Sequence, residues 1–360
     1  MKNKNYVFGL GFRAVFVVLF SLCVFMGCTK KNNASGELED SLYVYNWISY
    51  TPRSIIEKFE KEFNVHVSYD VFASNEEMYA KIQSGAAGYD IVFPSADYTS
   101  IMIGQGMFVP IDKSMITNLT NIDPLIFERA TYDPNMEYSV PYYWGASCVI
   151  VNTEYVKDYE RSWNIFGRKD LAGKMVMLDD MREVLGDALA AYGYSINTKD
   201  PMQIQDAANK VIDEWKPNLV KFDSEAFAKG YSSGDFWVVQ GYVENVLEEI
   251  GGNAKLRENT VAFIPKEGGP SYIDNMCILK GAKHPVAAHE FINFIHRPEI
   301  YAEFVNYFGL PATVNIPARE FVENPAYSTD DLSVTEVKED LGESVDIYND
   351  VWFNKVRIGK

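Results

Sequence analysis

The amino-acid sequence predicts an α/β protein made of two lobes. Its 360 residues exceed what one ordinary core holds and are enough for two α/β lobes. Hydrophobic residues make up 47% of the chain, so large cores can be buried. From residue 41 onward, strand-like and helix-like stretches alternate. Such alternation is typical of sheets whose strands are joined by helices.

The first series of elements ends before residue 94. Strands are predicted at 42–47, 65–69 and 90–93. Pro52 opens a helix at 53–63, because a proline in the first turn lacks only an N–H that the helix does not need. Ser74 and Glu77 have the spacing of a capping box for a helix that ends near residue 83. Strands and helices in this order imply a parallel sheet with right-handed crossovers.

The alternation resumes after Tyr143. Further strands are predicted at 148–151, 174–178, 236–239, 261–264 and 273–279. Helices are predicted at 182–192, 201–215, 285–295 and 298–308, with an amphipathic stretch at 347–356. On one of these helices Phe291, Phe294 and Ile295 share a face, which we assign to the core rather than to a ligand pocket.

The N-terminus has the pattern of an export signal. Basic residues precede a short apolar run at 14–26, and they are Lys2, Lys4 and Arg13. The run is too short and wrongly flanked for a stable membrane span, whereas its length suits the apolar region of a signal peptide. The chain is therefore predicted to be exported from the cytoplasm.

A cysteine at the end of the export signal predicts a lipid anchor. Gly27 and Cys28 resemble the lipobox of bacterial lipoproteins, in which the cysteine is acylated and becomes the first residue. Because the match is loose just before Gly27, the alternative is an ordinary signal peptide that contains a cysteine. We predict a signal peptide at 1–27 and an acylated Cys28 followed by a flexible linker, together spanning 28–40. The protein would then be periplasmic or extracytoplasmic and anchored to a bacterial membrane.

Charge and cysteine content exclude some functions. The formal net charge is −17, and no basic patch of the kind that nucleic-acid binders carry is present in the sequence. Cys148 and Cys277 both sit in apolar runs, where a cysteine is usually a small buried hydrophobic residue, and their spacing leaves a disulfide open. The four histidines are scattered, so no metal site and no cofactor are expected.

Four clusters combine aromatic rings, carboxylates or both. They lie at 46–50, 93–98, 178–183 and 272–274. Three of them follow predicted strands, and ligands of open α/β sheets collect at strand carboxyl ends. Aromatic rings cover methylene groups and accept cation–π contacts, while carboxylates pair with ammonium groups. The clusters therefore suit a flexible alkyl chain that carries cationic nitrogens.

Simpler interpretations of the same residues remain open. Asp179 and Asp180 would also serve as caps of the helix that follows them. Trp47 would also fit a hydrophobic core. Asp180 and Glu183 lie three residues apart, too close to flank a glycosidic bond from two sides, and no nucleophile, nucleotide-binding or metalloprotease motif occurs. An enzyme is therefore not expected.

Longer stretches of the chain resemble a known family. They lie at 45–50, 74–81, 89–95, 111–114, 140–146, 179–184, 265–269 and 291–298. In this order and spacing they are similar to the periplasmic spermidine/putrescine-binding proteins of polyamine ABC importers, from about Leu42 to the C-terminus. The resemblance implies a two-lobe periplasmic binding protein fold of type II, with the ligand in the interlobe cleft and closure like a hinged clamp. Lobe 1 would contain 41–145 plus 273–316, and lobe 2 would contain 146–272 plus 317–360.

The resemblance also implies which residues bind the ligand. Carried over residue by residue, they are Trp47, Tyr50, Ser95, Asp97, Asp180, Glu183, Ser224, Tyr242, Tyr272 and Asp274. Asp180, Glu183 and Asp274 match the family's amine-binding acids. Tyr242 and Tyr272 stand where relatives commonly have tryptophan, so their stacking role would be kept with smaller rings.

Several positions depart from the family pattern. Ile48 replaces a polar residue, and Leu310 falls where a tyrosine is found. Asp97 falls at another tyrosine position with Tyr98 just after it, so either side chain could face the ligand. A glutamine expected before the terminal helix is not clearly matched, and Lys338 is the nearest residue. The choice between spermidine and putrescine therefore stays open.

The resemblance implies a monomeric receptor that captures a polyamine and delivers it to an ABC permease in the membrane, without a cofactor. One alternative is a receptor of the same fold for another solute, such as a sugar, an amino acid or a metal chelate. A second alternative, from a different class, is a surface lipoprotein used for adhesion or structure. The second alternative predicts neither a tight small-molecule ligand nor closure.

Overall fold

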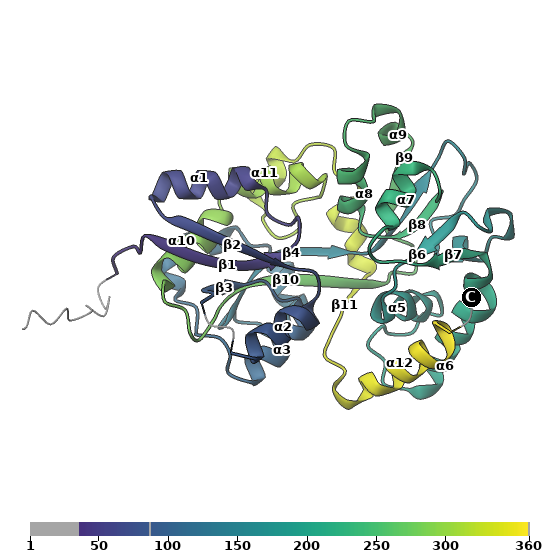
Figure 1. Ribbon diagram of the computed structural model, residues 1–360, viewed down its shortest axis with the longest axis horizontal. Coiled ribbons are helices and arrows are strands. Elements are labelled where there is room, and N and C mark those ends of the chain that lie inside the picture. Colours follow the sequence, from purple (N-terminus) through teal and green to yellow (C-terminus); the bar gives the residue numbers. More distant parts are fainter. Residues whose placement is uncertain (1–35, 86–87, 359–360) are drawn as a thin grey trace, which may run out of the picture. The chain divides into compact units, whose positions relative to one another are not determined.

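Two mixed sheets with helices on their faces organise the chain in the computed structural model, which describes residues 36–85 and 88–358 (Figure 1). The strands of the first sheet are β1 (Ser41–Trp47), β2 (His66–Phe72), β3 (Ile91–Val92), β4 (Ser139–Ala146), β10 (Pro270–Ile278) and β11 (Glu336–Val337). Their order is β11-β10-β3-β1-β2, with β4 also paired to β10.

The second sheet is built from the middle of the chain. Its strands are β5 (Cys148–Asn152), β6 (Met175–Met177), β7 (Leu219–Phe222), β8 (Val238–Gly241) and β9 (Thr260–Phe263), in the order β7-β6-β8-β5-β9. As predicted for the first sheet, β1 pairs in parallel with both β2 and β3. Antiparallel pairs complete both sheets, because β10 runs against β3 and β4, and β5 runs against β8 and β9.

Helices form at every position where the sequence predicted one, but the structure also has helices that were not predicted, at 96–104, 124–129, 227–233, 243–250 and 254–258. The α-helices are α1 (Arg53–Phe63), α2 (Asn75–Gln83), α3 (Ala96–Gly104), α4 (Pro124–Arg129), α5 (Met181–Ala191), α6 (Pro201–Lys210), α7 (Phe227–Ser233), α8 (Val243–Ile250), α9 (Ala254–Glu258), α10 (Pro285–Ile295), α11 (Pro298–Phe308) and α12 (Val345–Val351). The helix predicted at 201–215 is α-helical to Lys210 and continues as a π-helix to Trp215.

The predicted capping box at α2 forms only in part. The Ser74 side chain accepts a hydrogen bond from the Glu77 N–H at 3.2 Å. The Glu77 carboxylate, however, accepts from the Ala73 N–H at 2.9 Å rather than from Ser74. The backbone N–H groups of Ala73 and Glu77 both have side-chain acceptors, so the motif still stabilises the start of the helix.

Apolar side chains cover both faces of each sheet. In the second sheet Val149 and Val151 of β5 pack on one side and Ile150 on the other, as strand alternation requires. Tyr45 of β1 joins a smaller cluster beneath the first sheet. Phe291, Phe294 and Ile295 are buried in the largest cluster, which confirms their assignment to the core.

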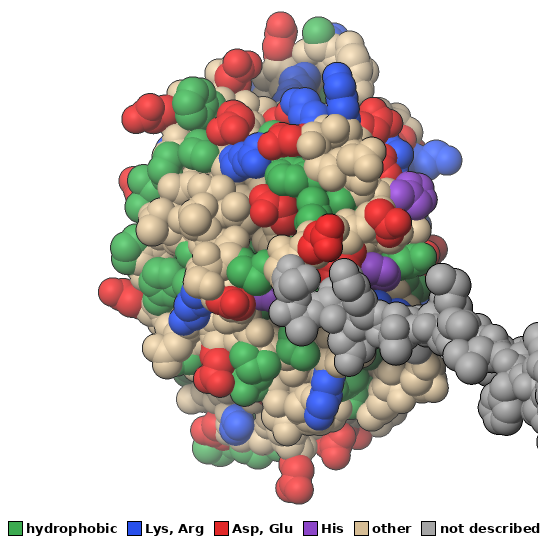
Figure 2. All heavy atoms as spheres, turned by 90° about the vertical axis from the view of Figure 1, so that its left-hand side faces the viewer, with side chains coloured by type: hydrophobic (Ala, Val, Ile, Leu, Met, Phe, Trp, Pro, Cys, Tyr) green, Lys and Arg blue, Asp and Glu red, His purple; other side chains and the backbone are tan. Residues whose placement is uncertain are grey.

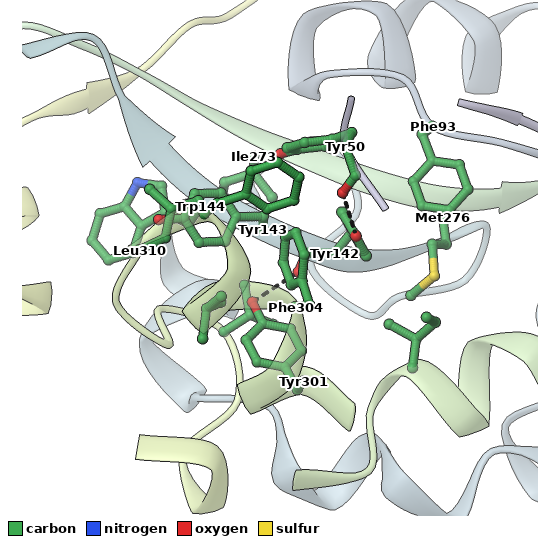
Figure 3. Close-up of a cluster of buried hydrophobic side chains, with 14 of the residues drawn as sticks. Tyr50, Phe93, Tyr142, Tyr143, Trp144, Ile273, Met276, Tyr301, Phe304 and Leu310 are labelled. Atoms are coloured by element: carbon green, nitrogen blue, oxygen red, sulfur yellow. Dashed lines mark hydrogen bonds between the residues drawn. The ribbon is translucent and has the colours of Figure 1, made fainter. Parts of the chain in front are cut away.

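Buried aromatic side chains join β4 to the segment that follows β1 (Figure 3). The Tyr142 hydroxyl donates to the Tyr50 carbonyl at 2.9 Å, and the Tyr301 hydroxyl donates to the Tyr142 carbonyl at 2.9 Å. Phe304 packs against Tyr142 with ring centroids 4.6 Å apart. This cluster fixes the backbone of Tyr50 relative to the first sheet.

The chain returns to both sheets after residue 316. Ala318 and Leu332 lie in the largest apolar cluster, whereas Leu341 and Tyr348 lie in the second cluster. These elements all belong to one unit, Leu38–Lys360. The lobe boundaries given above remain a prediction.

The predicted anchor and signal peptide at 1–27 lie outside the described residues, as does Cys28. Within 36–85 and 88–358, no helix combines the length and the apolar character that a membrane crossing requires. Cys148 and Cys277 are buried free thiols on β5 and β10. Figure 2 shows Asp and Glu side chains spread over one face, with Lys and Arg side chains between them.

A buried acid ties β1 to the start of α10, and its removal should destabilise the fold. The Asp90 side chain, 1% exposed, accepts from the Tyr43 N–H at 2.9 Å and from the N–H groups of Lys283 and His284 at 2.7 and 3.0 Å. Asp90→Ala leaves these donors without partners, so we expect a loss of about 3 kcal/mol in the free energy of unfolding, measured with urea. Asp206→Ala, at an exposed position of α6, should change it by less than about 0.5 kcal/mol. Equal effects of both variants would contradict this role.

Candidate functional site

Asp274 of β10 is the centre of the first group of site residues. Its side chain is 4% exposed. The Tyr50 hydroxyl donates to Oδ2 at 2.6 Å, and the Ser95 hydroxyl donates to Oδ1 at 2.6 Å. The predicted residues Tyr50, Ser95 and Asp274, which come from three distant parts of the chain, therefore meet at one carboxylate.

Strand alternation places Tyr272 on the same face of β10 as Asp274. Tyr272 stands opposite Gly145 of β4 in the antiparallel register. A Cβ atom on Gly145 would lie 2.5 Å from the Tyr272 hydroxyl oxygen and 2.8 Å from the Tyr143 ring. Glycine is required at position 145 because the two tyrosines approach its backbone so closely.

Glu183 of α5 is the centre of a second group. Its side chain is 1% exposed, and Oε1 lies 2.5 Å from the ammonium nitrogen of Lys338. The Tyr242 hydroxyl donates to the same oxygen at 3.2 Å. The other oxygen, Oε2, is buried and has no hydrogen-bond partner among the described residues. Glu183 and Tyr242 were predicted for the site, whereas Lys338 was noted only as the residue nearest an unmatched glutamine.

Two further carboxylates act on the Lys338 ammonium group. Burial lowers the pKa of Lys338, but the charges of Glu183, Asp180 and Asp97 outweigh it and raise that pKa above its ordinary value. Burial raises the pKa of Asp97, and the charges of Lys338 and Arg182 oppose the rise. The structure thus brings Asp97 and Asp180 close enough to Lys338 for their charges to act on it.

Asp180 caps the start of α5, which is the simpler role that the sequence analysis considered for it. Its Oδ1 accepts from the N–H groups of Arg182 and Glu183, at 2.8 and 3.1 Å, at the start of α5. The cap places the Asp180 charge at a helix N-terminus, where negative charge is favoured. Asp179 instead pairs with Arg357, 2.5 Å away, on the outer side of this turn.

Glu244, in the first turn of α8, is a site acid that sequence reasoning missed. The Tyr272 hydroxyl donates to its Oε1 at 3.3 Å. Burial raises the pKa of Glu244 to about 7, and the negative charge of Asp274 adds to the rise. The only signal in the sequence was the position of Glu244 two residues after Tyr242, which the family pattern had already placed in the site.

A fully buried acid lies one turn beyond Glu183 on α5. Both carboxyl oxygens of Asp187 lack a hydrogen-bond partner among the described residues. Burial, together with the charges of Glu183 and Asp180, raises the pKa of Asp187 well above its usual range. Burial therefore favours the protonated, neutral form of Asp187.

The predicted aromatic residues of the site lie in two places, because Tyr242 and Tyr272 donate to Glu183 and Glu244, whereas Trp47 packs against Phe72. Tyr242 and Tyr272 meet edge to face, with ring centroids 5.8 Å apart. Trp47 is half-buried, and its ring is fixed because its indole N–H donates to the Phe93 carbonyl at 2.9 Å. Its ring centroid lies 4.6 Å from that of Phe72. The Trp47 ring thus packs against the apolar clusters and is not fully buried in the core.

Other positions that were singled out lie elsewhere. Ser224 is exposed in the segment before α7, and among the described residues it has no hydrogen bond to the site. Ile48 is 56% exposed, and Leu310 is buried in the aromatic cluster (Figure 3). Within the described parts of the chain, no group of three or more His, Cys, Asp or Glu side chains is arranged to hold a metal ion.

The electrostatics of the site favour a cation. Burial raises the pKa of Asp274 to about 6, although the hydrogen bonds from Ser95 and Tyr50 and the charge of Lys338 lower it. The tyrosines stay neutral, because burial raises the pKa of Tyr50, Tyr242 and Tyr272 well above the ordinary value. Acids with raised pKa values bind protons when the site is empty and would release them to solvent when a cationic ligand binds.

Comparison with known proteins places the chain in a family. The profile of bacterial extracellular solute-binding proteins matches residues 54–331. The chain belongs to the bacterial extracellular solute-binding proteins. A member of this family binds its ligand without changing it covalently, so the chain is not an enzyme, as the sequence indicated.

Particular members of the family are similar over most of their length. A protein of Salmonella typhimurium named spermidine/putrescine-binding periplasmic protein is 35% identical over 331 residues, which cover 89% of this chain and 92% of that protein. The crystal structure of the TpPotD lipoprotein of Treponema pallidum has a TM-score of 0.85 and 48% identity, covering 88% of this chain and 99% of that one.

A second solved structure agrees with the first. The spermidine/putrescine ABC transporter substrate-binding protein PotD of Streptococcus pneumoniae has a TM-score of 0.78 and 28% identity. It covers 88% of this chain and 98% of that chain. These likenesses confirm the prediction of a type II periplasmic binding protein fold for this solute-binding protein.

The raised pKa of Asp274 can be measured directly. In the ligand-free protein we expect its carboxyl carbon to titrate near pH 6 by NMR. Tyr50→Phe should raise this pKa further, because it removes a hydrogen bond that stabilises the carboxylate. Tyr327→Phe is the control, since that hydroxyl contacts Tyr143 at 3.1 Å rather than Asp274. Titration near pH 4 in the unaltered protein would contradict the assignment.

Proposed function

We propose that this solute-binding protein captures a linear polyamine, spermidine or putrescine, outside the cytoplasm and delivers it to an ABC importer. The observation that carries the proposal is a group of carboxylates, of which Glu183 and Asp274 are buried and the others half-buried, that accept hydrogen bonds from aromatic side chains. Burying such acids is unfavourable unless a cation or a proton compensates for the lost hydration. The names of the similar proteins from Salmonella and Streptococcus support the same ligand class.

The two groups of acids would bind different amines of the ligand. Asp274 and Glu244 form no ion pair with any Lys or Arg side chain of the described chain, so one ammonium group of the ligand would lie between them. Asp97, Asp180 and Glu183 would attract another. The rings of Trp47, Tyr242 and Tyr272 would cover the methylene groups, as alkyl chains with cationic ends require. Ser224 would contribute only if its segment moved.

Closure and anchoring complete the proposal. Two lobes, 41–145 plus 273–316 and 146–272 plus 317–360, would close over the ligand and present the closed form to a permease. An acyl group on Cys28 would hold the protein at the membrane surface through a linker shorter than the predicted 28–40, because Leu38 packs against the largest apolar cluster and Glu39 accepts from the Ala287 N–H at 2.7 Å. The name of the similar Treponema protein, a lipoprotein, supports this anchor. Monomeric action and the absence of a cofactor are part of the same proposal.

Calorimetry tests the proposal on the mature chain from Lys30 onward. The protein is unfolded and refolded to remove carried-over ligand, then titrated with spermidine, putrescine, spermine, cadaverine and a set of sugars. We expect a micromolar or tighter dissociation constant for a polyamine, about −8 kcal/mol or better. Heat from a sugar and none from any polyamine would contradict the proposed ligand while leaving the fold unchanged.

The role of Asp274 is tested in the same assay. Asp274→Ala removes the partner of one ammonium group, so we expect polyamine affinity to fall about 30-fold or more. The matched control is Asp170→Ala, which removes an equal charge that pairs with Arg168 at an exposed position. The control should stay within about twofold of the unaltered protein. A change of less than twofold for Asp274→Ala would show that this carboxylate does not hold an amine.

A further inference from the structure

The ammonium group of Lys338 lies inside the site where the amines of the ligand would bind. Its nitrogen lies 2.5 Å from Glu183 Oε1. The side chains of Lys338 and Glu183 are only 14% and 1% exposed. The contact therefore lies in the interior of the protein rather than on its surface, where ion pairs are weak and variable.

Backbone pairing fixes where Lys338 stands. β11 pairs in parallel with the start of β10, with Glu336 opposite Pro270. The Lys338 N–H then donates to the Ser271 carbonyl at 2.9 Å. Because this bond holds Lys338 beside the residue that precedes Tyr272, the lysine side chain is directed to the site by the sheet itself.

The surroundings keep this lysine charged. Glu183, Asp180 and Asp97 all act on its ammonium group, and together they outweigh the effect of burial on its pKa. Arg182, the other cation of this region, is engaged elsewhere, because its guanidinium donates to the Glu339 carbonyl and to Asn197. Lys338 is thus the cation that forms an ion pair with Glu183.

Neither Asp274 nor Glu244 forms an ion pair with a Lys or Arg side chain of the described residues, although the charge of Lys338 also lowers the pKa of Asp274. Asp274 accepts from two hydroxyl groups, and Glu244 accepts from one. The raised pKa values of both acids, about 6 and about 7, reflect sites that hold protons when no cation is present. One end of the site is therefore open to an ammonium group, while the other end already contains one.

We propose that Lys338 is a built-in ammonium group that takes one amine position of the site, so that this protein selects diamines over triamines. The inference rests on the proposed function and deepens it. A third ligand ammonium placed near Glu183 would meet the like charge of Lys338 in a poorly hydrated interior, which is strongly unfavourable. A diamine needs no third position, so it can leave the place beside Glu183 to Lys338.

Selectivity is measured by calorimetry as the ratio of the dissociation constants for spermidine and putrescine, on protein freed of ligand by refolding. We expect the unaltered protein to favour putrescine by about tenfold or more. Lys338→Gln keeps a hydrogen-bond donor for Glu183 but removes the charge, and it should lower this ratio by about tenfold or more. Lys338→Met, which removes both, should lower the ratio in the same direction.

A matched control separates this effect from the loss of any buried lysine. Lys210 of α6 is 8% exposed and pairs with Glu214 at 2.9 Å, away from the site. Lys210→Met should leave the ratio within about twofold. Thermal unfolding of each variant, followed by circular dichroism, identifies a variant that fails to fold, and Lys338→Gln is the variant expected to fold because Glu183 keeps a donor.

The outcomes distinguish the inference from the function on which it rests. A lowered ratio in folded Lys338→Gln, with an unchanged ratio in Lys210→Met, supports the role of Lys338. Equal affinities for both polyamines in the unaltered protein, or a ratio that Lys338→Gln leaves unchanged, overturns the inference but not the proposed function. An unaltered protein that binds no polyamine overturns both.

Discussion

Buried carboxylates impose the constraint on which this structure depends, because each must be compensated by hydrogen-bond donors, by a proton or by a cation. Asp274 has two hydroxyl donors, Glu183 has Lys338, and burial raises the pKa of Asp187, which favours its protonated form. Protons on Asp274 and Glu244 can be exchanged for ammonium groups. Burying these acids is therefore unfavourable while no ligand is bound, and binding of a cationic ligand offsets that unfavourable free energy.

β10 is the element that brings the compensating groups together. Its residues from Pro270 to Ile278 are all buried, and it pairs with β3, β4 and β11. This strand carries Tyr272 and Asp274. Its pairing with β4 places Tyr272 against Gly145, and its pairing with β11 holds the segment that contains Lys338. Pro270 also packs against α5 at Gly186, where a Cβ atom would lie 2.4 Å from the proline ring. Both groups of acids are thus positioned by contacts with a single strand.

Periodicity in the sequence was enough to place α1, α10 and α11 at their observed bounds, since each has a proline at its start and an apolar face. It did not predict β4, which is apolar at every position because both faces are buried, and so shows no alternation. Asp97, Asp180, Glu183 and Asp274 lie in clusters that composition and predicted strand ends had singled out, and the family pattern then selected them as ligand-binding residues. Glu244 and the contact of Lys338 with Glu183 were not predicted, because they depend on which strands meet, and a two-residue strand such as β11 has no sequence signature.

The number of protons released when a polyamine binds tests this account most directly. Calorimetry at pH 6.5 in two buffers of different ionisation enthalpy measures that number, and the polyamine nitrogens stay protonated at this pH. With pKa values of about 6 for Asp274 and about 7 for Glu244, the empty site holds about one proton on these two acids. The account predicts the release of about one proton for each polyamine bound. Binding without proton release would contradict it, because the carboxylates would then already be ionised without the ligand.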